Sequence, residues 1–198
     1  MKDSFFTVAA PAEGLYKEKG SKFLSYIFEI RNEDEAVTIV ADFKKRYHDA
    51  RHHCYAYQLG VDGEKYREND DGEPSGTAGK PIRGQIRSKG LTNVLVVVVR
   101  YFGGTKLGVS GLINAYKLAA LDAIGQAVVV EKMVESTISF TFGYLVMNDV
   151  MKLIKELDCQ IVSQEFGNSS NFIISIRKSH HNRAVEALKK IEGVVITD

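Results

Sequence analysis

Cysteine is scarce in this sequence, long apolar runs are absent, and the net charge is close to zero. Only two cysteines occur, Cys54 and Cys159, far apart and outside any CxxC pair, which excludes a disulfide scaffold. The longest strongly apolar run, Val94–Val99, is far shorter than the ~20 residues that a membrane-spanning helix needs. Residues 1–10 hold no apolar core of a signal peptide. We therefore expect a protein of the reducing cytoplasm with no membrane segment.

The near-zero net charge limits the kinds of charged partner that the protein can bind. The chain has 26 Lys and Arg residues against 25 Asp and Glu residues, a formal net charge of +1 at pH 7. This balance excludes a uniformly basic nucleic-acid coat and a strongly acidic mimic, so a charged partner must bind a local patch. The 198 residues, 44% of them hydrophobic, suffice for one large domain or two small ones, each with its own core.

The first part of the chain alternates strand and helix patterns. Residues 22–30 are rich in aromatic and β-branched side chains and predict a strand. Residues 32–47 predict a helix, with Asn32 as its N-cap and an acidic first turn. A second strand is expected over 54–61, and a turn-rich loop follows over 62–79.

Residues 93–102, NVLVVVVRYF, form the strongest predicted strand. Four consecutive valines suit a strand that is buried on both faces, which indicates a central place in its sheet. Gly103 and Gly104 end the strand, and a helix is expected from about Leu112 to Ala127. Another helix is expected over 77–89.

The pattern restarts after residue 130. Strands are expected over 134–142, 159–166, 171–177 and 194–197, and helices over 144–157 and from a possible N-cap at Ser179 to Gly193. The resulting order, βαββαβ, matches the ferredoxin-like plan. We therefore expect an α+β protein of two domains, 1–130 and 131–198, with the boundary near residues 130–134.

Charge is distributed unevenly along the chain. Acidic residues outnumber basic ones over 62–73, whereas residues 74–121 contain no acidic residue at all. The basic residues of this acid-free stretch are Lys80, Arg83, Arg87, Lys89, Arg100, Lys106 and Lys117. One interpretation is an ordinary solvated surface that the acidic loop partly neutralises. The other is a footprint for the phosphate backbone of a nucleic acid, with Lys80, Arg83 and Arg87 on one helix face.

The segment GGTKLGVSG, residues 103–111, joins the predicted buried strand to a helix. Backbone N–H groups, the positive end of the helix and Lys106 converge there, which favours an anion. Gly103, Gly104 and Ser110 belong to this junction. Val109 stands where a Walker P-loop needs lysine, and no GxGxxG occurs, so neither familiar nucleotide motif is present. The alternative is that the glycines only permit a tight turn and close packing.

Arg100, Tyr101 and Phe102 follow the valine run. An arginine beside two aromatic rings can stack on bases or engage a protein. In the alternative interpretation Phe102 belongs to the core and Arg100 pairs with the acidic loop.

Metal and catalytic sites are poorly supported. His52 and Cys54 would share one face of a strand while His53 points away, and no second ligand cluster is evident, so no zinc site is expected. No GxSxG occurs.

The acidic loop has two interpretations as well. Asp70, Asp71 and Glu73 could act as paired carboxylates. Equally, this segment makes a standard turn in which Ser75 or Thr77 caps the next helix. We predict no catalytic residue, no cofactor and no metal.

Four segments carry a resemblance to a known family. They are EKGSKF at 18–23, HDARHHCYAY at 48–57, NDDGEPSGTAGKPI at 69–82 and NVLVVVVRYFGGTKLGVSGLINAY at 93–116. Together they resemble the YigZ/Impact family over most of residues 1–130, and the remaining residues resemble the second domain of its bacterial members.

The resemblance implies a fold and a set of positions. The first domain would share the α+β fold of ribosomal proteins and of domain IV of elongation factor G, and the second would be ferredoxin-like. It implies binding to RNA or the ribosome by analogy, and it supplies no established catalytic residue. The positions that match its motifs are Arg100, Tyr101, Phe102, Gly103, Gly104 and Lys106, with His53, Asp70, Asp71, Glu73, Ser75 and Thr77 expected to face them in a cleft.

The sequence therefore predicts a cytoplasmic, non-enzymatic protein that binds RNA or the ribosome through residues 74–121 and modulates translation. A competing hypothesis is an enzyme acting on a phosphorylated small molecule through the acidic loop 70–73 and the glycine loop 103–111. A third is a protein–protein regulator with Tyr101 and Phe102 as anchors. The sequence does not specify an oligomeric state.

Overall fold

The computed structural model describes residues 3–197, so the outermost residues of the two expected domains lie outside the described part. It divides into two compact units. The first unit spans Ser4–Lys132, and the second consists of the chain from Met133 onward together with Asp3. No helix among the described residues is long and apolar enough to cross a bilayer.

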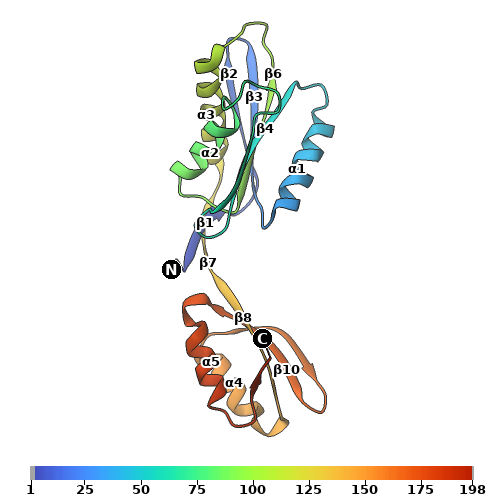
Figure 1. Ribbon diagram of the computed structural model, residues 1–198, viewed down its shortest axis with the longest axis vertical. Helices are drawn as coiled ribbons and strands as arrows, with labels where there is room; N and C mark the ends of the chain where they lie inside the picture. Colours follow the sequence, from blue (N-terminus) through green and yellow to red (C-terminus); the bar gives the residue numbers. More distant parts are fainter. Residues whose placement is uncertain (1–2, 198) are drawn as a thin grey trace. The chain divides into compact units, whose positions relative to one another are not determined.

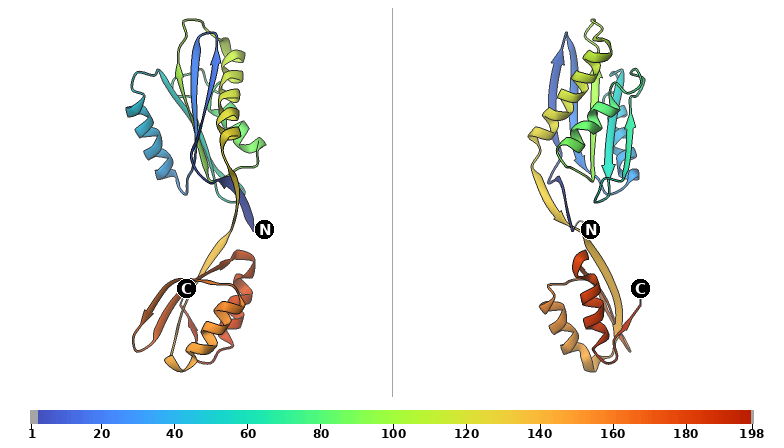
Figure 2. Two further views of the ribbon diagram at one scale, coloured as in Figure 1. Left: turned by 180° about the vertical axis from the view of Figure 1, so that it is seen from behind. Right: turned by 60° about the vertical axis from the view of Figure 1, so that its left-hand side comes forward.

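The first unit is a five-stranded antiparallel sheet with helices on both faces (Figures 1 and 2). Its elements are β1 (Ser4–Val8), β2 (Ala12–Glu18), β3 (Ser21–Glu29), α1 (Glu33–Arg46), β4 (His52–Leu59), β5 (Lys65–Asn69), α2 (Gly79–Ser88), β6 (Val94–Tyr101), α3 (Gly108–Gln126) and β7 (Val129–Met133), the last of which extends by one residue into the second unit. The strand order is β2-β3-β6-β4-β5, while β1 pairs with β7 outside this sheet. Helix α1 covers one face, and α2 and α3 lie side by side on the other (Figure 2).

Strand β6 is central, as the valine run predicts, and the two helical layers explain its composition. Val94, Val96 and Val98 pack in the core under α2 and α3. The alternate side chains, Leu95, Val97 and Val99, pack in a second core under α1. A strand buried on both faces has no polar side, so its alternation disappears even in an antiparallel sheet.

The start of α1 is confirmed. The Asn32 side chain accepts a hydrogen bond from the Glu35 N–H at 2.9 Å, as an N-cap does. The predicted start of α3 is too late, since this helix begins at Gly108, inside the glycine-rich junction. Strand β5 has no counterpart among the predicted strands, because it is an exposed edge strand with the polar sequence KYREN.

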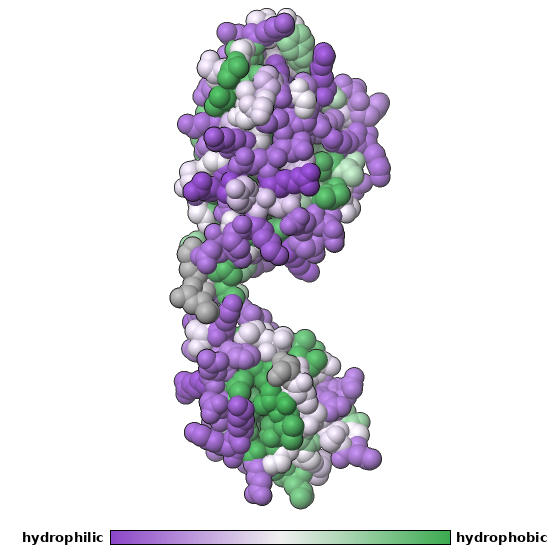
Figure 3. Space-filling model, viewed as in Figure 1, coloured by the Kyte–Doolittle hydropathy of each residue, from purple (hydrophilic) through white to green (hydrophobic). Residues whose placement is uncertain are grey.

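The second unit is a four-stranded antiparallel sheet with two helices (Figure 1). Its elements are β8 (Glu135–Phe142), α4 (Met147–Glu156), β9 (Gln160–Phe166), β10 (Ser170–Arg177), α5 (His181–Lys189) and β11 (Val195–Ile196), with short 3-10 turns before each helix. The strand order is β11-β8-β10-β9. Its own core combines apolar side chains of both helices and the sheet, and Figure 3 shows further apolar side chains on its surface.

Asp3 belongs to this second unit, although it precedes every strand of the first unit in sequence. The Asp3 carboxylate accepts hydrogen bonds from the Ser179 N–H at 3.0 Å and the Ser179 hydroxyl at 2.7 Å, and it pairs with Arg177 at 3.0 Å. The prediction that Ser179 caps the last helix is wrong. Helix α5 begins at His181, and the hydroxyl of Ser179 is engaged by Asp3 instead.

Candidate functional site

A pocket lies where β4 begins, β6 ends and α3 begins. In the sheet, Arg100 of β6 is paired with His52 of β4, and both point to the α2 and α3 face because side chains alternate along a strand. We call the cavity the α3 pocket; its volume is about 530 Å³. It is lined by Arg51, His52, Gly72, Glu73, Pro74, Arg100, Phe102, Lys106, Leu107, Gly108, Val109 and Leu112.

A buried charge pair forms the base of the α3 pocket. Arg100 donates from Nη1 to Glu73 Oε1 at 2.5 Å, and the Tyr116 hydroxyl donates to the same oxygen at 2.8 Å. Burial raises the pKa of Tyr116, so its hydroxyl stays protonated and remains a donor at neutral pH. Cys54 donates in turn to the Tyr116 oxygen at 3.3 Å. Glu73 therefore joins the loop before α2 to both β6 and α3.

The guanidinium of Arg100 is only partly satisfied. Its side chain is 6% exposed, and its Nε has no hydrogen-bond partner. The guanidinium carbon lies 5.4 Å from the ring centre of Phe23 and 5.8 Å from that of Phe102. Arg100 thus confirms the predicted pairing with the acidic loop and keeps unused donors at the pocket wall.

His52 also lines the pocket. Its Nδ1 lies 2.8 Å from the Asp71 carbonyl oxygen, which only accepts, so this nitrogen carries a proton. Its Nε2 lies 3.8 Å from Glu73 Oε1. The orientation of the imidazole is therefore fixed by the backbone of the acidic loop.

The first turn of α3 faces the pocket without a cap. Leu107 stands at the N-cap position, no side chain accepts a hydrogen bond there, and the first turn contains no acidic residue. The N–H groups at the start of a helix have no partner within it, and they carry the positive end of the helix dipole. Gly108 and Val109 line the pocket, and Lys106 beside them is exposed.

Gly103 and Gly104 of the glycine-rich junction have different structural roles. Gly103 packs so closely on the backbone of Gly20 and Ser21 that a Cβ atom could not be accommodated. Gly104 adopts a left-handed conformation, φ +85°, with open space around it. The expectation of a tight turn with close packing is thus confirmed at these positions, which set the path from β6 into α3.

Asp70 caps α2 from a distance. Its carboxylate accepts hydrogen bonds from the N–H groups of Gly76, Ala78 and Gly79 at 2.8, 2.9 and 2.8 Å. The prediction that Ser75 or Thr77 caps this helix is wrong. Thr77 donates its hydroxyl to the Pro74 carbonyl at 2.6 Å, and Ser75 is exposed.

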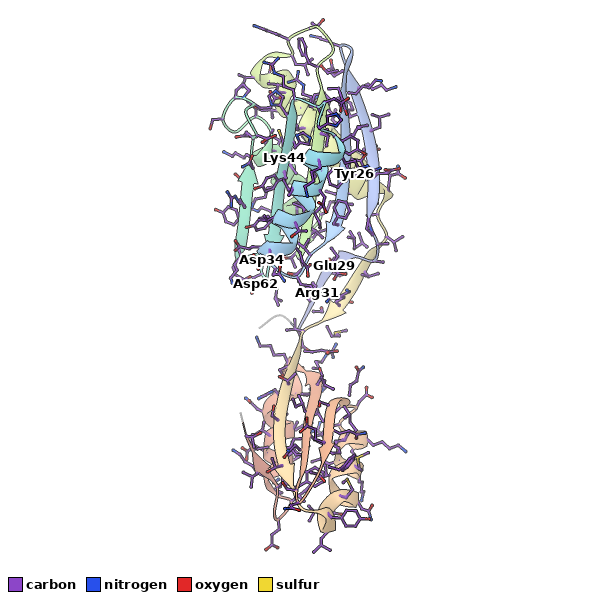
Figure 4. The ribbon with its side chains drawn as sticks, turned by 90° about the vertical axis from the view of Figure 1, so that its right-hand side faces the viewer. Tyr26, Glu29, Arg31, Asp34, Lys44 and Asp62 are labelled. Carbon is purple, nitrogen blue, oxygen red and sulfur yellow. The ribbon has the colours of Figure 1, made fainter. Side chains whose placement is uncertain are left out.

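Asp71 fixes the strand β4 against α1. Its carboxylate accepts from Lys44 Nζ at 2.7 Å and from the His53 N–H at 2.7 Å; Lys44 is labelled in Figure 4, which views the α1 side. Burial would raise the pKa of Asp71, but the hydrogen bonds from Lys44 and His53 outweigh burial and leave this pKa below its usual value. The His53 ring contacts the Tyr47 carbonyl, away from the pocket.

Tyr101 likewise lies outside the pocket. It follows Arg100 on β6 and therefore points to the α1 face, where its hydroxyl donates to Asp49 at 2.8 Å. Phe102, half exposed, lines the pocket instead.

The basic residues of the acid-free stretch divide into two groups. Arg83 pairs with Glu68 at 3.0 Å and stacks on Tyr66, and Arg100 pairs with Glu73. The others are exposed and make no ion pair within residues 3–197: Lys80, Arg87, Lys89, Lys106 and Lys117. We call these five residues the α2–α3 surface. On the face of this unit that Figure 3 draws, most of the surface is hydrophilic.

The structure thus brings together Glu73, Arg100, Phe102 and Lys106 of the predicted cleft. It places His53, Asp70, Asp71 and Thr77 in supporting positions outside the pocket wall, and Ser75 is exposed outside it as well. Two polar pocket residues, Arg51 and His52, are absent from the predicted site. His52 lies two residues before Cys54 on β4, so the alternation of side chains along a strand puts both on the same face and could have identified His52. Arg51 precedes β4, so strand alternation does not predict where its side chain lies. No cluster of possible metal ligands occurs among the described residues.

Comparison with known proteins relates the chain to one protein family and to a solved structure of similar fold. The family described as the Impact N-terminal domain matches residues 19–124. The chain is 33% identical over 171 residues to the IMPACT family member YvyE of Bacillus subtilis, covering 86% of this chain and 78% of that protein. It is 31% identical over 166 residues to the IMPACT family member YigZ of Escherichia coli, covering 83% and 81%. A crystal structure of a hypothetical protein, 26% identical, covers 99% of this chain and 97% of its own, with a TM-score of 0.77.

Proposed function

This chain belongs to the IMPACT family, and from that premise we propose that it is a non-enzymatic cytoplasmic protein that binds RNA or the ribosome and modulates translation. The observation that carries the proposal is the α2–α3 surface, whose five cations are exposed and have no acidic neighbour in residues 74–121. Free cations on one side of a domain attract a phosphate backbone, because binding releases the counterions condensed on it.

The second unit would add a contact of its own. We propose that the chain acts as two domains, 1–130 and 131–198, and that the second is ferredoxin-like. The order of its elements and the strand order β11-β8-β10-β9 support this assignment. Two weak contacts on one chain bind more tightly than either alone, because the second binds at a high effective concentration.

The test is a salt titration of binding to purified ribosomes and to single- and double-stranded RNA. The variant Lys80→Gln/Lys117→Gln removes one exposed charge from each helix of the α2–α3 surface. The matched control, Lys17→Gln/Lys45→Gln, removes two exposed charges from β2 and α1. We expect about tenfold weaker binding for the first variant, and a salt slope that falls by about one for each phosphate group that the variant no longer neutralises.

Equal effects in both variants would contradict the α2–α3 surface as the interface. Binding that does not change with salt would exclude a phosphate footprint and favour a protein contact, with Phe102 as an exposed anchor.

A further inference from the structure

The α3 pocket is built differently from the α2–α3 surface, and an extended phosphate backbone does not require it. We propose that the α3 pocket binds a phosphate monoester, a single terminal phosphate attached to an organic group. This inference goes beyond the proposed function and does not depend on it, because the pocket residues other than Lys106 lie outside the α2–α3 surface.

The first observation is the uncapped helix. Helix α3 has 19 residues, no side-chain cap and no acidic residue in its first turn, although both are common at helix starts. Its first residues, Gly108 and Val109, line the pocket. Their N–H groups are donors with no partner in the helix, and a phosphate is a ligand for which such a turn is suited.

The second, independent observation is Arg100. Its side chain is buried, with 6% of its surface exposed, and it lines the pocket. Within residues 3–197 its guanidinium makes one hydrogen bond, from Nη1 to Glu73, and its buried Nε has no acceptor. A guanidinium carries five N–H donors, so beyond the enclosed Nε and the bond to Glu73 further Nη donors of Arg100 remain without an acceptor among the described residues. Unsatisfied donors of a buried arginine that lines a pocket cost free energy, and an acceptor bound in the pocket would relieve this cost.

The charge of the pocket selects an anion. Arg51, Arg100 and Lys106 contribute three cations against the single carboxylate of Glu73. Arg100 pairs with Glu73, so the charges of Arg51 and Lys106 remain unopposed among the lining residues, a net charge of +2. A single engaged carboxylate is a poor site for a divalent cation, which prefers several oxygen ligands.

The shape of the pocket selects an ester over the free ion. Its volume, about 530 Å³, exceeds the space that one phosphate fills and falls in the range of sites for small organic ligands. Apolar side chains form much of its wall: Phe102, Leu107, Val109 and Leu112. They would cover the group that carries the phosphate, and the half-exposed Phe102 ring is available for stacking.

The experiment measures binding by isothermal titration calorimetry with AMP, adenosine and inorganic phosphate on the full chain. Adenosine lacks only the phosphate, so it is the matched control ligand. We expect AMP to bind at least about tenfold more tightly than either of the others. The proposal is overturned if AMP binds no better than adenosine, or if its Kd is weaker than about 1 mM.

Two variants locate the site. Val109→Asp places a carboxylate in the exposed first turn of α3, a position where acidic residues favour the helix, so the fold is retained. Its charge competes with the ligand, and we expect AMP affinity to fall at least about tenfold. Arg51→Gln/Lys106→Gln should have a similar effect, while Lys117→Gln on the same helix should have none. Unchanged AMP binding in Val109→Asp would place the ligand elsewhere and overturn the proposal.

A final pair of probes separates the two sources of such a phosphate. Short RNA with a 5′-phosphate is compared with the same RNA carrying a 5′-hydroxyl. A 5′-phosphate preference that Val109→Asp abolishes would assign the pocket to RNA ends, whereas AMP binding without this preference would assign it to small metabolites. Loss of RNA binding in Lys80→Gln/Lys117→Gln with AMP binding retained would separate the surface from the pocket.

Discussion

Glu73 holds the residues at the base of the α3 pocket in place, because its buried carboxylate accepts hydrogen bonds from both Arg100 and Tyr116. A buried charge pair contributes little net stability, but removing one partner leaves the other charge without compensation in a medium of low dielectric constant. The pair therefore fixes the position of Arg100 at the pocket wall more than it stabilises the fold.

The charge pair can be tested by a double-mutant cycle. We expect Arg100→Met to lower the free energy of unfolding by about 3 kcal/mol or more, since Glu73 would remain buried and charged. Arg100→Met/Glu73→Gln should recover part of this loss, because the second change removes the isolated charge. Urea unfolding of the wild type, the single variants Arg100→Met and Glu73→Gln, and the double variant gives the four free energies of unfolding that the cycle needs. Strictly additive losses would show that the two groups are not coupled.

Because the pKa of Asp71 is lowered by folding, the free energy of unfolding depends on pH in the acid range. Burial opposes ionisation, but Lys44 and the His53 N–H prevail, so the folded pKa lies below the ordinary value of 3.8. A depressed folded pKa contributes stability that is present above the unfolded pKa and is lost as pH falls through the folded pKa. We expect the wild-type free energy of unfolding to decrease below about pH 4, and Asp71→Asn to flatten this part of the profile. Identical slopes in both proteins would exclude Asp71 as a contributor.

At the scale of elements, helix α2 depends on a residue outside it. Its N-cap position, Ala78, has no capping side chain. Asp70, which lies in the preceding loop, accepts hydrogen bonds from the N–H groups of Gly76, Ala78 and Gly79 instead. The acidic loop therefore acts as part of the helix start.

Substitution of Asp70 tests this arrangement against the predicted one. Asp70→Ala should cost about 2 kcal/mol in the free energy of unfolding, at the upper end of measured cap losses, because three donors lose their acceptor together. Ser75→Ala, the matched control at a position favoured by sequence alone, should cost less than about 0.5 kcal/mol. A larger effect of Ser75→Ala than of Asp70→Ala in chemical denaturation would reverse the assignment.

Helices and strands could be predicted from the sequence where the residues within the element itself determine its structure. The valine run of β6 and the Asn32 cap of α1 are local signals, and both are confirmed. The polar edge strand β5 has no such signal. The cap of α2 escaped prediction because Asp70 lies eight residues before Ala78, and only the folded loop brings them together.

The pocket was predictable in part for the same reason. Arg100, Phe102 and Lys106 are close in sequence to the glycine junction, so local patterns predict them. His52 joins them through its pairing with Arg100 across two strands, and this register is a property of the sheet.

At the scale of the whole molecule, the two units have separate cores with no shared member. Such units are expected to unfold separately. The second unit is nevertheless discontinuous in sequence, since Asp3 supplies the acceptor for Ser179 and a partner for Arg177.

Removing the Asp3 carboxylate should therefore affect one unit only. In Asp3→Ala we expect faster amide hydrogen exchange in residues 133–197 and unchanged exchange in the sheet of the first unit. Glu192→Ala removes an exposed charge of the same sign from the second unit and is the control. Faster exchange in both units, or in neither, would contradict the assignment of Asp3.

The same discontinuity has a consequence for biosynthesis. Asp3 leaves the translating machinery long before its partners Arg177 and Ser179, because Ser179 follows it by 176 residues. The first unit can complete its fold while the nascent protein is still being elongated, because all of its strands precede residue 134. The second unit can close only after Arg177 and Ser179 have been synthesised, so a pause or premature stop before residue 177 would leave a finished first unit joined to an unfinished one.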